Sequence, residues 1–397
     1  MSTALLESEH SNWLTAQMTL CALAIVSLLY IPIPILAQIA DTYSLPASTE
    51  GYALSIFGVA YASGFLVFGP LSDLLGRRRI MIFGLILVGI TSLGFLWVKD
   101  STTFFILRAI QGFAAASFPP VALAFLAERG TLKQKTWAIA CMSTAFLSAA
   151  LLGQIYGGSV ARQWGFAQSL IPLLLIYVIT AFFILNTHAD KRAITGNSSV
   201  WYVYKTIGPL LKNLSLLKAY IPSFVLLMVF VAFYINLDFR YGSWLLQHGV
   251  SQIGVREIAI PAFLAPLFLP RLIGRYGPKK VVSAGLFVAS LGLLLTALIG
   301  ANNDYRILLI TTVVYALGVG VSVPGLISWV SSNSPVQSRG MAISLYTFFL
   351  FIGASLGPWL SGVIQHSGSK YSFLILSIIM FVVTILSVTA NKVTKDI

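Results

Sequence analysis

Twelve long apolar segments divide this 397-residue chain, and they constrain its fold more than any other feature of the sequence. Hydrophobic residues make up 57% of the chain and charged residues only 9%, too few charges to give so long a chain a polar surface. A helix needs about 20 apolar residues to cross a bilayer, whereas a membrane β-barrel would show short alternating segments. We therefore predict an all-α membrane protein with helices near 14–39, 50–71, 80–98, 103–127, 136–160, 167–187, 216–239, 253–273, 280–300, 305–330, 340–365 and 371–390.

The distribution of positive charge predicts how these helices are oriented. The formal net charge of +13 is also typical of nucleic-acid-binding proteins. If the N-terminus lies inside, however, most Lys and Arg fall in inner segments, and the exceptions are Lys99, Arg108, Arg162, Arg240, Arg256, Arg306 and Lys370. Positive residues concentrate on the cytoplasmic side of membrane proteins. We predict a multi-pass protein with both termini cytoplasmic, embedded in lipid and not bound to nucleic acid; the short loops favour a bacterial inner membrane.

The second half of the sequence repeats features of the first. Residues 71–79 read LSDLLGRRR and residues 272–280 read LIGRYGPKK, so that the Leu, the Gly and the last two basic positions coincide. A second alignment places residues 153–158 on 357–362 and Pro120 on Pro324. We predict two pseudo-symmetric six-helix halves, 1–187 and 216–397, joined by a cytoplasmic linker at 188–215.

Three motifs make the chain similar to a known family. Residues 69–79, GPLSDLLGRRR, form a charged loop between two apolar segments, and with the repeat they resemble the major facilitator superfamily over essentially the whole chain. Residues 108–112, RAIQG, resemble the fourth-helix motif of its proton-coupled members. Residues 153–158, GQIYGG, resemble its GPxxGG antiporter motif, with Gln154 in place of the proline. The resemblance implies a twelve-helix transporter similar to the drug:proton antiporters, which alternates access by rocking its two halves.

The resemblance also implies a conformational latch at the first motif. Its aspartate, here Asp73, would abut a helix N-terminus of the other half, and its basic residues would pair with an acid at the end of the fourth helix, where Glu128 stands. A basic loop that only orients the chain is the alternative, but charge alone does not require Gly69, Asp73 or Gly76. Gly274 occupies the position of Asp73 in the second copy, so we expect an asymmetric latch. The candidate latch residues are Gly69, Asp73, Gly76, Arg77, Arg78 and Glu128.

Proton coupling requires a titratable group within the membrane region. Arg108 lies inside the fourth apolar segment, with Gln111 one turn further on. Its side chain therefore either faces a cavity or a polar partner, or snorkels to the outer interface. Asp238 with Arg240, and Arg256 with Glu257, could form one ionic cluster at an outer cavity, although a purely structural network is the alternative. No acid lies in the middle of a predicted helix. The candidates for proton coupling are Arg108, Asp238, Glu257 and Asp41, with Asp238 the first choice.

The substrate cavity is predicted from the helices that line it in the family resembled: the first, fourth, seventh and tenth. Mixed aromatic walls with few polar groups suit an amphipathic organic substrate. Pro32 and Pro34 are expected to bend the first helix near its middle. The cavity candidates are Tyr30, Gln38, Arg108, Gln111, Phe118, Gln154, Phe233, Tyr234, Asn236, Tyr315 and Ser322, and the candidates for close helix packing are Gly153, Gly157, Gly158, Gly357 and Pro358.

We predict proton-coupled efflux of small amphipathic organic compounds by a monomer. A facilitator or symporter for a specific metabolite or organic anion is the alternative, favoured by Gln154 and by the lack of deep acids. A non-transporting receptor is a third reading, which would be expected to carry a soluble signalling domain. No enzymatic activity, metal or cofactor is expected, because the sequence shows neither metal-ligand spacing among its four His residues nor a phosphate-binding loop.

Overall fold

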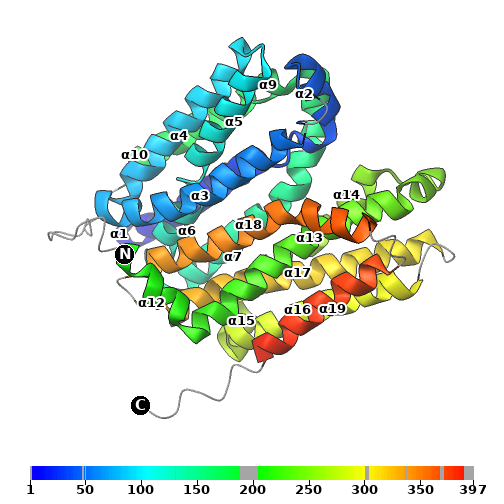
Figure 1. Ribbon diagram of the computed structural model, residues 1–397. Helices are drawn as coiled ribbons and strands as arrows, with labels where there is room; N and C mark the ends of the chain where they lie inside the picture. The colour runs from blue at the N-terminus through cyan, green and yellow to red at the C-terminus, as the bar shows by residue number, and fades with distance from the viewer. Residues whose placement is uncertain are drawn as a thin grey trace. The chain divides into compact units, whose positions relative to one another are not determined.

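The chain folds as helices that match the twelve predicted segments. The computed structural model describes residues 2–46, 49, 51–129, 131–187, 204–299, 304–335, 338–366 and 371–388 (Figure 1). Among these residues, nine helices are long and apolar enough to cross a membrane, and a bent pair, Ile253–Phe268 with Pro270–Tyr276, would be a tenth span. Two shorter apolar helices, Trp13–Ser27 and Ser372–Val388, account for the remaining segments. The predicted all-α, twelve-helix membrane fold is confirmed.

Contacts divide the chain into two compact units. Unit 1 is Met1–Ile207 with Gln337–Phe348, and unit 2 is Gly208–Val336 with Phe349–Ile397. The predicted linker, 188–215, falls at this division, but its residues 188–203 lie outside the described residues. Residues 337–348, which the sequence places in the second half, group instead with unit 1. The first turns of α18 (Arg339–His366) therefore belong to the packing of unit 1.

Unit 1 is built around two pairs of packed helices, α3 on α5 and α1 on α7. Side-chain caps begin two of its helices. Asp100 accepts the backbone N–H of Thr103 at 2.9 Å before α5, and this bond lowers the pKa of the Asp100 carboxyl. Thr131 and Gln134 form a reciprocal capping box before α7. The helices of unit 1 are α1 (Ser2–Ser27), α2 (Leu36–Thr42), α3 (Tyr52–Leu75), α4 (Arg77–Gly94), α5 (Ser101–Ala115), α6 (Pro119–Glu128), α7 (Leu132–Tyr156), α8 (Arg162–Trp164), α9 (Phe166–Ser169) and α10 (Ile171–Leu185).

Unit 2 packs α16 against both α17 and α19, and α13 against α19. Side chains of Asn213, Ser251 and Asp304 cap the starts of α13, α14 and α17. The span that contains Pro261, Pro266 and Pro270 is broken, with a bend of 51°. The helices of unit 2 are α12 (Ile207–Lys212), α13 (Leu214–Gln247), α14 (Gln252–Phe263), α15 (Pro270–Tyr276), α16 (Pro278–Ile299), α17 (Tyr305–Asn333), the later part of α18, and α19 (Ser372–Val388).

The first predicted span is interrupted, as the two prolines led us to expect. α1 ends at Ser27, the chain then turns, and a short 3-10 helix, Ile33–Ile35, leads into α2. Pro32 and Pro34 have no backbone N–H to donate, and two such residues so close together favour a break in the helix. The interruption leaves backbone carbonyl groups near residue 28 available to other side chains.

The repeated loop has the same backbone shape in both units. Gly76, between α3 and α4, has φ +93°, and Gly277, between α15 and α16, has φ +81°. These two glycines coincide in the sequence alignment of 71–79 with 272–280. An L-residue rarely adopts this conformation, so glycine is required for the turn in each copy.

Candidate functional site

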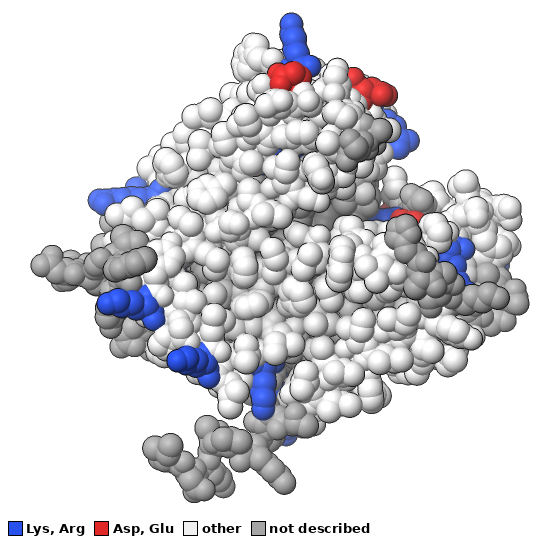
Figure 2. All heavy atoms as spheres, in the orientation of Figure 1, with Lys and Arg blue, Asp and Glu red and all other residues white. Residues whose placement is uncertain are grey.

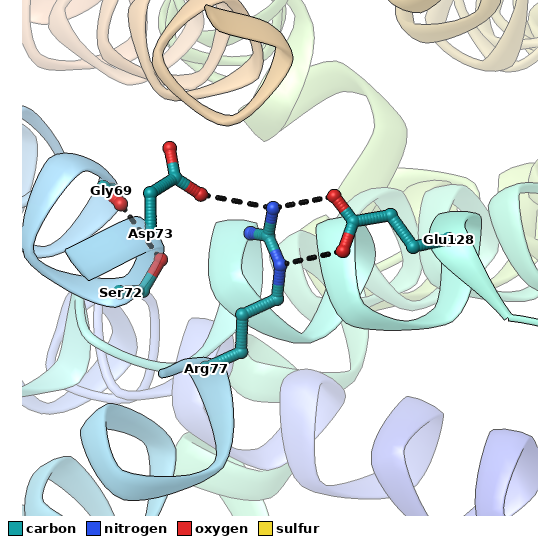
Figure 3. A network of polar contacts seen from close by, with 5 residues as sticks. All are labelled: Gly69, Ser72, Asp73, Arg77 and Glu128. Atoms are coloured by element: carbon teal, nitrogen blue, oxygen red, sulfur yellow. Dashed lines mark hydrogen bonds and ion pairs between the residues drawn. The ribbon is translucent and has the colours of Figure 1, made fainter. Parts of the chain in front are cut away.

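One arginine joins the start of α4 to the ends of two other helices. Nε of Arg77 donates to Oε2 of Glu128 at 3.0 Å, and Nη2 donates to Oε1 at 2.7 Å (Figure 3). The same Nη2 lies 2.9 Å from Oδ1 of Asp73. Asp73 and Arg77 are largely buried, with side-chain exposures of 11% and 9%, whereas the Glu128 side chain is 36% exposed. Two carboxylates share one guanidinium, so this network carries a net negative charge.

The negative network lies at the first turn of α18. The carboxylate of Asp73 is so close to Gly340 that a Cβ on this glycine would collide with both carboxylate oxygens. A Cβ on Gly69 would likewise overlap the hydroxyl of Ser344. The unpaired N–H groups at a helix start carry partial positive charge and favour an adjacent anion. The structure therefore places Asp73 at the first turn of α18, in a segment that groups with unit 1.

Arg78 interacts with a different helix end. Its guanidinium donates to the backbone carbonyls of Thr187, at 2.9 Å, and of Leu185, which lie at the C-terminal end of α10. A cation at this end satisfies carbonyls that have no partner within the helix and opposes the helix dipole. Successive arginines in the same loop therefore serve different purposes: Arg77 pairs with acids, and Arg78 caps a helix.

Arg108 is fully buried, with 0% exposure, so it does not snorkel to an interface. Its guanidinium donates to the carbonyl oxygens of Leu28 and Ala53, at 3.3–3.4 Å, and to Oε1 of Gln111 at 2.8 Å. The Phe57 ring lies beneath it, 4.3 Å from its central carbon. Gln111 in turn donates to Ser92 at 3.0 Å. All of these partners are neutral groups. Because Leu28 follows the end of α1, Arg108 also binds a carbonyl in the interrupted part of the first span.

Two glycines of the predicted packing motif face the same interrupted segment. A Cβ on Gly157 would collide with the carbonyl of Ile31, and one on Gly153 would lie 3.0 Å from the carbonyl of Ser27. Gln154, which stands where the family motif has proline, donates to the carbonyl of Ala150 at 2.6 Å. The helix nevertheless departs from α geometry just beyond, as a π-helical stretch at Gly157–Ala161. The close approach of α7 to the interrupted span is therefore direct backbone packing.

The corresponding glycine of unit 2 packs in the same way. A Cβ on Gly357 of α18 would lie 2.5 Å from Cβ of Val231 on α13, and one on Gly353 would collide with the carbonyl of Phe224. Pro358, next to Gly357, lies inside α18 and is exposed. Gly158 is partly buried in its π-helical stretch.

A second ion pair lies in unit 2. Nη2 of Arg256 on α14 lies 2.6 Å from Oδ2 of Asp238 on α13. The side chains are 8% and 19% exposed, and the guanidinium carbon lies 5.3 Å from the centre of the Tyr234 ring. The predicted cluster is therefore brought together at Asp238 and Arg256, whereas Arg240 and Glu257 are exposed.

Aromatic side chains fill the interior of unit 2 beside this pair. Phe233 and Tyr315 lie 4.5 Å apart by ring centres and are both fully buried, and Phe233 also contacts Phe373 of α19. Asn236 is 2% exposed and donates to Ser361 of α18 at 2.9 Å. These predicted cavity residues therefore pack within unit 2, between its own helices.

The remaining predicted residues are distributed over unit 1. Phe118 is fully buried at the break between α5 and α6, and Tyr30 is 5% exposed beside Gly153. Gln38 is half-buried and donates to the carbonyl of Arg162, and Asp41 is exposed. No group of three or more His, Cys, Asp or Glu that could hold a metal occurs within the part of the chain described.

Sequence reasoning did not identify several partners that complete these sites. Gly340 and Ser344 show no motif of their own, and their role follows from how closely α18 approaches α3. Ser92 and Phe57, which surround the buried arginine, are ordinary residues for apolar helices.

Known proteins with the same fold and related sequence identify the family. The sequence model of the Major Facilitator Superfamily matches residues 18–265 and 258–395, and the chain belongs to this family of membrane transporters. It is 23% identical over 361 residues to multidrug resistance protein 2 of Bacillus subtilis (strain 168), with 88% of each chain covered. It is also 23% identical over 352 residues to the uncharacterized MFS-type transporter YybF of the same organism, covering 85% of this chain and 83% of that one.

Solved structures give the same fold. The human organic anion transporter MFSD10 (TETRAN) superposes with a TM-score of 0.76 at 18% sequence identity, over 96% of this chain and 99% of that chain. The predicted class is thus confirmed: this protein is a multi-pass membrane transporter of the Major Facilitator Superfamily, and not an enzyme.

Proposed function

We propose that this transporter exports small amphipathic organic compounds in exchange for protons, by alternating access. The observation that carries the proton-coupling part is the Asp238–Arg256 ion pair. Among the Asp and Glu residues whose side-chain burial the structure describes, Asp73 and Asp238 alone are not exposed. Asp73 belongs to the network with Arg77 and Glu128, which leaves Asp238 as the shielded carboxylate that can take up and release a proton.

The ion pair supplies a way for protonation to change structure. Deprotonated Asp238 holds Arg256 at 2.6 Å beside the ring of Tyr234. A proton on this carboxylate removes its charge and weakens its attraction for the buried guanidinium of Arg256, which is unfavourable. Protonation therefore favours rearrangement of α13 against α14. A conformational step triggered in this way is what exchange of a proton for a substrate requires.

The Asp73–Arg77–Glu128 network serves in this proposal as the latch that distinguishes two states. It is held by short charge-assisted bonds, and its carboxylate lies at the first turn of α18. Bonds of this kind are strong but few, so they can break and re-form during a transport cycle without loss of the fold. The multidrug resistance proteins among the relatives support export as the direction.

A facilitator or symporter for an organic anion or a specific metabolite is the second candidate. Its support is the buried Arg108, whose guanidinium is bound by carbonyl and amide oxygens and by no carboxylate among the contacts described. Arg256 is already paired with Asp238, so Arg108 is the buried guanidinium that would attract an anionic compound. The human relative by fold is an organic anion transporter.

The test is transport by the purified protein in liposomes with an imposed pH gradient. Amphipathic cations such as ethidium and tetraphenylphosphonium, and an amphipathic anion such as carboxyfluorescein, are offered separately. We expect a cation or neutral compound to move against its own gradient only while the pH gradient persists. Movement of the anion alone, or movement that ignores the pH gradient, would favour the second candidate.

A further inference from the structure

Helix α14 is separated from the remainder of its span by a break. The run Ile253–Phe268 meets α15 at an angle of 51°, and its last turn, Ala265–Phe268, is a 3-10 helix. Prolines at 261, 266 and 270 remove backbone N–H groups on both sides of this bend. A helix interrupted in this way resists bending less, and short segments of this kind act as hinges. Residues 264–269 therefore form a candidate hinge between α14 and α15.

The opposite end of α14 is joined to α13 by a short turn, residues 248–251 (Figure 1). Gly249 in this turn has φ +76°, and a Cβ placed on it would meet nothing within 4 Å. The Ser251 side chain accepts the backbone N–H of Gly254 at 3.0 Å and so caps the first turn of α14. α14 is therefore a capped helix with an open turn at one end and the candidate hinge at the other.

Close packing of α14 is found beside the candidate hinge. A Cβ on Gly320 of α17 would lie 2.6 Å from the carbonyl oxygen of Ala262, and the ring centre of Phe263 lies 5.8 Å from that of Phe230 on α13. Further from the hinge, the buried apolar residues of α14 are Val255 and Ala259, whose small side chains bury little area. These contacts hold the hinge end of α14 more firmly than the remote end.

An ion pair holds the remote half of α14. Nη2 of Arg256 lies 2.6 Å from Oδ2 of Asp238, and Nη1 lies 3.5 Å from Oδ1, so the guanidinium contacts the carboxylate at two points. Charged residues make up only 9% of this chain, and Figure 2 shows a face that is largely uncharged. Charge-assisted bonds at two points are strong, but they depend on both partners. The pair is therefore suited to act as a catch between α13 and α14.

Two buried hydroxyls without hydrogen bonds lie in the aromatic interior beside this pair. The guanidinium carbon of Arg256 lies 5.3 Å from the ring centre of Tyr234, and Phe233 contacts both Tyr234 and Tyr315, at 5.2 Å and 4.5 Å by ring centres. Neither tyrosine hydroxyl has a hydrogen-bond partner among the described residues, and both oxygens are buried. A buried hydroxyl without a partner is unfavourable. The packing of α14 on α13 thus carries a cost that the admission of water would remove.

We propose that α14 is a lid of unit 2, hinged at residues 264–269 and held shut by the Arg256–Asp238 pair. When the pair separates, the remote half of α14 swings away from α13. Water then reaches the hydroxyls of Tyr234 and Tyr315, and the hydrogen bonds gained offset part of the loss of the ion pair. The lid controls access to the carboxylate of Asp238 and to the aromatic residues around it.

The lid deepens the proposed function, and its part in transport rests on that function, because a proton on Asp238 would release the catch. The movement itself does not require proton coupling, since removal of either charged partner also releases the catch. The lid is therefore measured at one pH, without a gradient and without a transported compound. A failure of proton flux and a failure of lid movement are then separate results.

The test measures the position of the lid in the full-length protein by double electron–electron resonance. Cys21 and Cys141 are replaced by Ala, and spin labels are attached at Ile258→Cys and Leu272→Cys, exposed positions on the two sides of the hinge. The parent is expected to give one narrow distance distribution. Arg256→Gln is expected to raise the population at a second distance at least about tenfold, because the closed state has lost its catch.

Two controls make this outcome specific to the hinge. Labels at Leu272 and Leu298 lie on α15 and α16, both exposed, and this pair does not span the hinge. Its distance is expected to be the same in Arg256→Gln as in the parent. Glu257→Gln, a change at the exposed neighbour of Arg256, is expected to leave the distance between positions 258 and 272 unchanged.

The role of the hydroxyls is tested in the Arg256→Gln background. Tyr234→Phe removes one hydroxyl that only the open state can satisfy, so it is expected to lower the open population about fivefold, the usual net value of one hydrogen bond. Tyr177→Phe is the matched control, because the Tyr177 hydroxyl is also buried without a described partner but belongs to unit 1. This control is expected to leave the open population unchanged.

Three results would overturn the proposal. A parent-like distance distribution in Arg256→Gln would mean that the pair does not hold α14. Equal broadening of the pair at 272 and 298 would mean general loosening of unit 2, without a hinge. An open population that Tyr234→Phe does not lower would mean that the hydroxyls are not exposed by the movement. If Arg256→Gln does not fold, Asp238→Asn, which removes the other partner of the catch, decides the outcome.

Discussion

The guanidinium of Arg77 holds the carboxylate of Glu128 at two points, with N–O distances of 3.0 Å and 2.7 Å. The two residues are 51 positions apart in the chain, so this contact joins the start of α4 to the last residue of α6. Asp73, near the end of α3, binds the same guanidinium, and its carboxylate lies against Gly340 at the start of α18. A single side chain therefore links three segments that are distant in sequence.

The strength of this pair can be measured directly. Arg77→Gln and Glu128→Gln, combined in a double-mutant cycle on thermal unfolding, are expected to show a coupling free energy of about 1 kcal/mol. The value is modest because the Glu128 side chain is 36% exposed and solvent screens its charge. A coupling below about 0.3 kcal/mol, the usual error of additivity, would mean that the contact is incidental.

The contact between Asp73 and α18 predicts that Gly340 cannot be replaced. Gly340→Ala is expected to destabilise the protein by about 1–3 kcal/mol, the usual cost of overpacking, because the new Cβ would collide with the Asp73 carboxylate. The double variant with Asp73→Ala is expected to lose less, because the carboxylate that obstructs the Cβ is gone. Gly274→Ala, at the equivalent of Asp73 in the second copy, is the control.

A Cβ on Gly274 would meet nothing within 4 Å, so this control is expected to be neutral or slightly stabilising. Unfolding temperatures of the three variants give the comparison. If Gly340→Ala is as stable as the parent, the approach of α18 to Asp73 is not as close as described here.

The packing of α7 on the interrupted first span gives a matched pair of glycine variants. Gly157→Ala is expected to cost about 1–3 kcal/mol, because its Cβ would collide with the carbonyl of Ile31. Gly362→Ala, in the aligned segment of α18, is expected to be tolerated, because nothing lies within 4 Å of its Cβ. The measurement is the fraction of folded protein recovered at increasing temperature. Equal losses in the two variants would argue against direct backbone packing at Gly157.

Arg108 is expected to stabilise the broken helix through the shape of its guanidinium as well as through its charge. It donates to carbonyls of two segments and to Gln111, a fork that a lysine ammonium cannot reproduce. Arg108→Lys is therefore expected to lower stability by about 1–3 kcal/mol through carbonyls left without donors. The control is Gln111→Glu, which keeps an acceptor for Arg108. If Arg108→Lys matches the parent in unfolding temperature and transport, the charge alone is required.

The helices could be predicted from sequence because each needs a long apolar run, and such runs are visible without a structure. The loop of the proposed latch was equally visible, because the charged segment GPLSDLLGRRR stands between two apolar runs. The breaks inside the spans were harder to place: Pro32 and Pro34 indicated one, but the π-helical stretch at Gly157–Ala161 has no proline. It depends on packing against a distant segment, which local sequence does not reveal.

Long-range partners were the least predictable part of the sites. Asp238 was expected near Arg240 or Arg256. The structure brings Nη2 of Arg256, on α14, to 2.6 Å from the carboxylate of Asp238. Arg108 could have snorkelled, and only the packing of three segments shows that it is enclosed. Aromatic residues such as Tyr315 could face a cavity or a core, and their neighbours within unit 2 cannot be inferred from spacing along one helix.

Proton uptake at Asp238 is the central claim, and proton flux in liposomes tests it most directly. The protein is reconstituted with a pH-sensitive dye inside, a transported compound is added, and the initial rate of the pH change is recorded for the parent, Asp238→Asn and Glu257→Gln. Glu257 is the matched control, because it is an exposed acid next to Arg256. We predict that Asp238→Asn lowers the compound-dependent proton flux at least about tenfold, the usual contribution of a positioned acid or base, while Glu257→Gln keeps it. Parent-like proton flux in folded Asp238→Asn would contradict the account and reduce the Asp238–Arg256 pair to a structural contact.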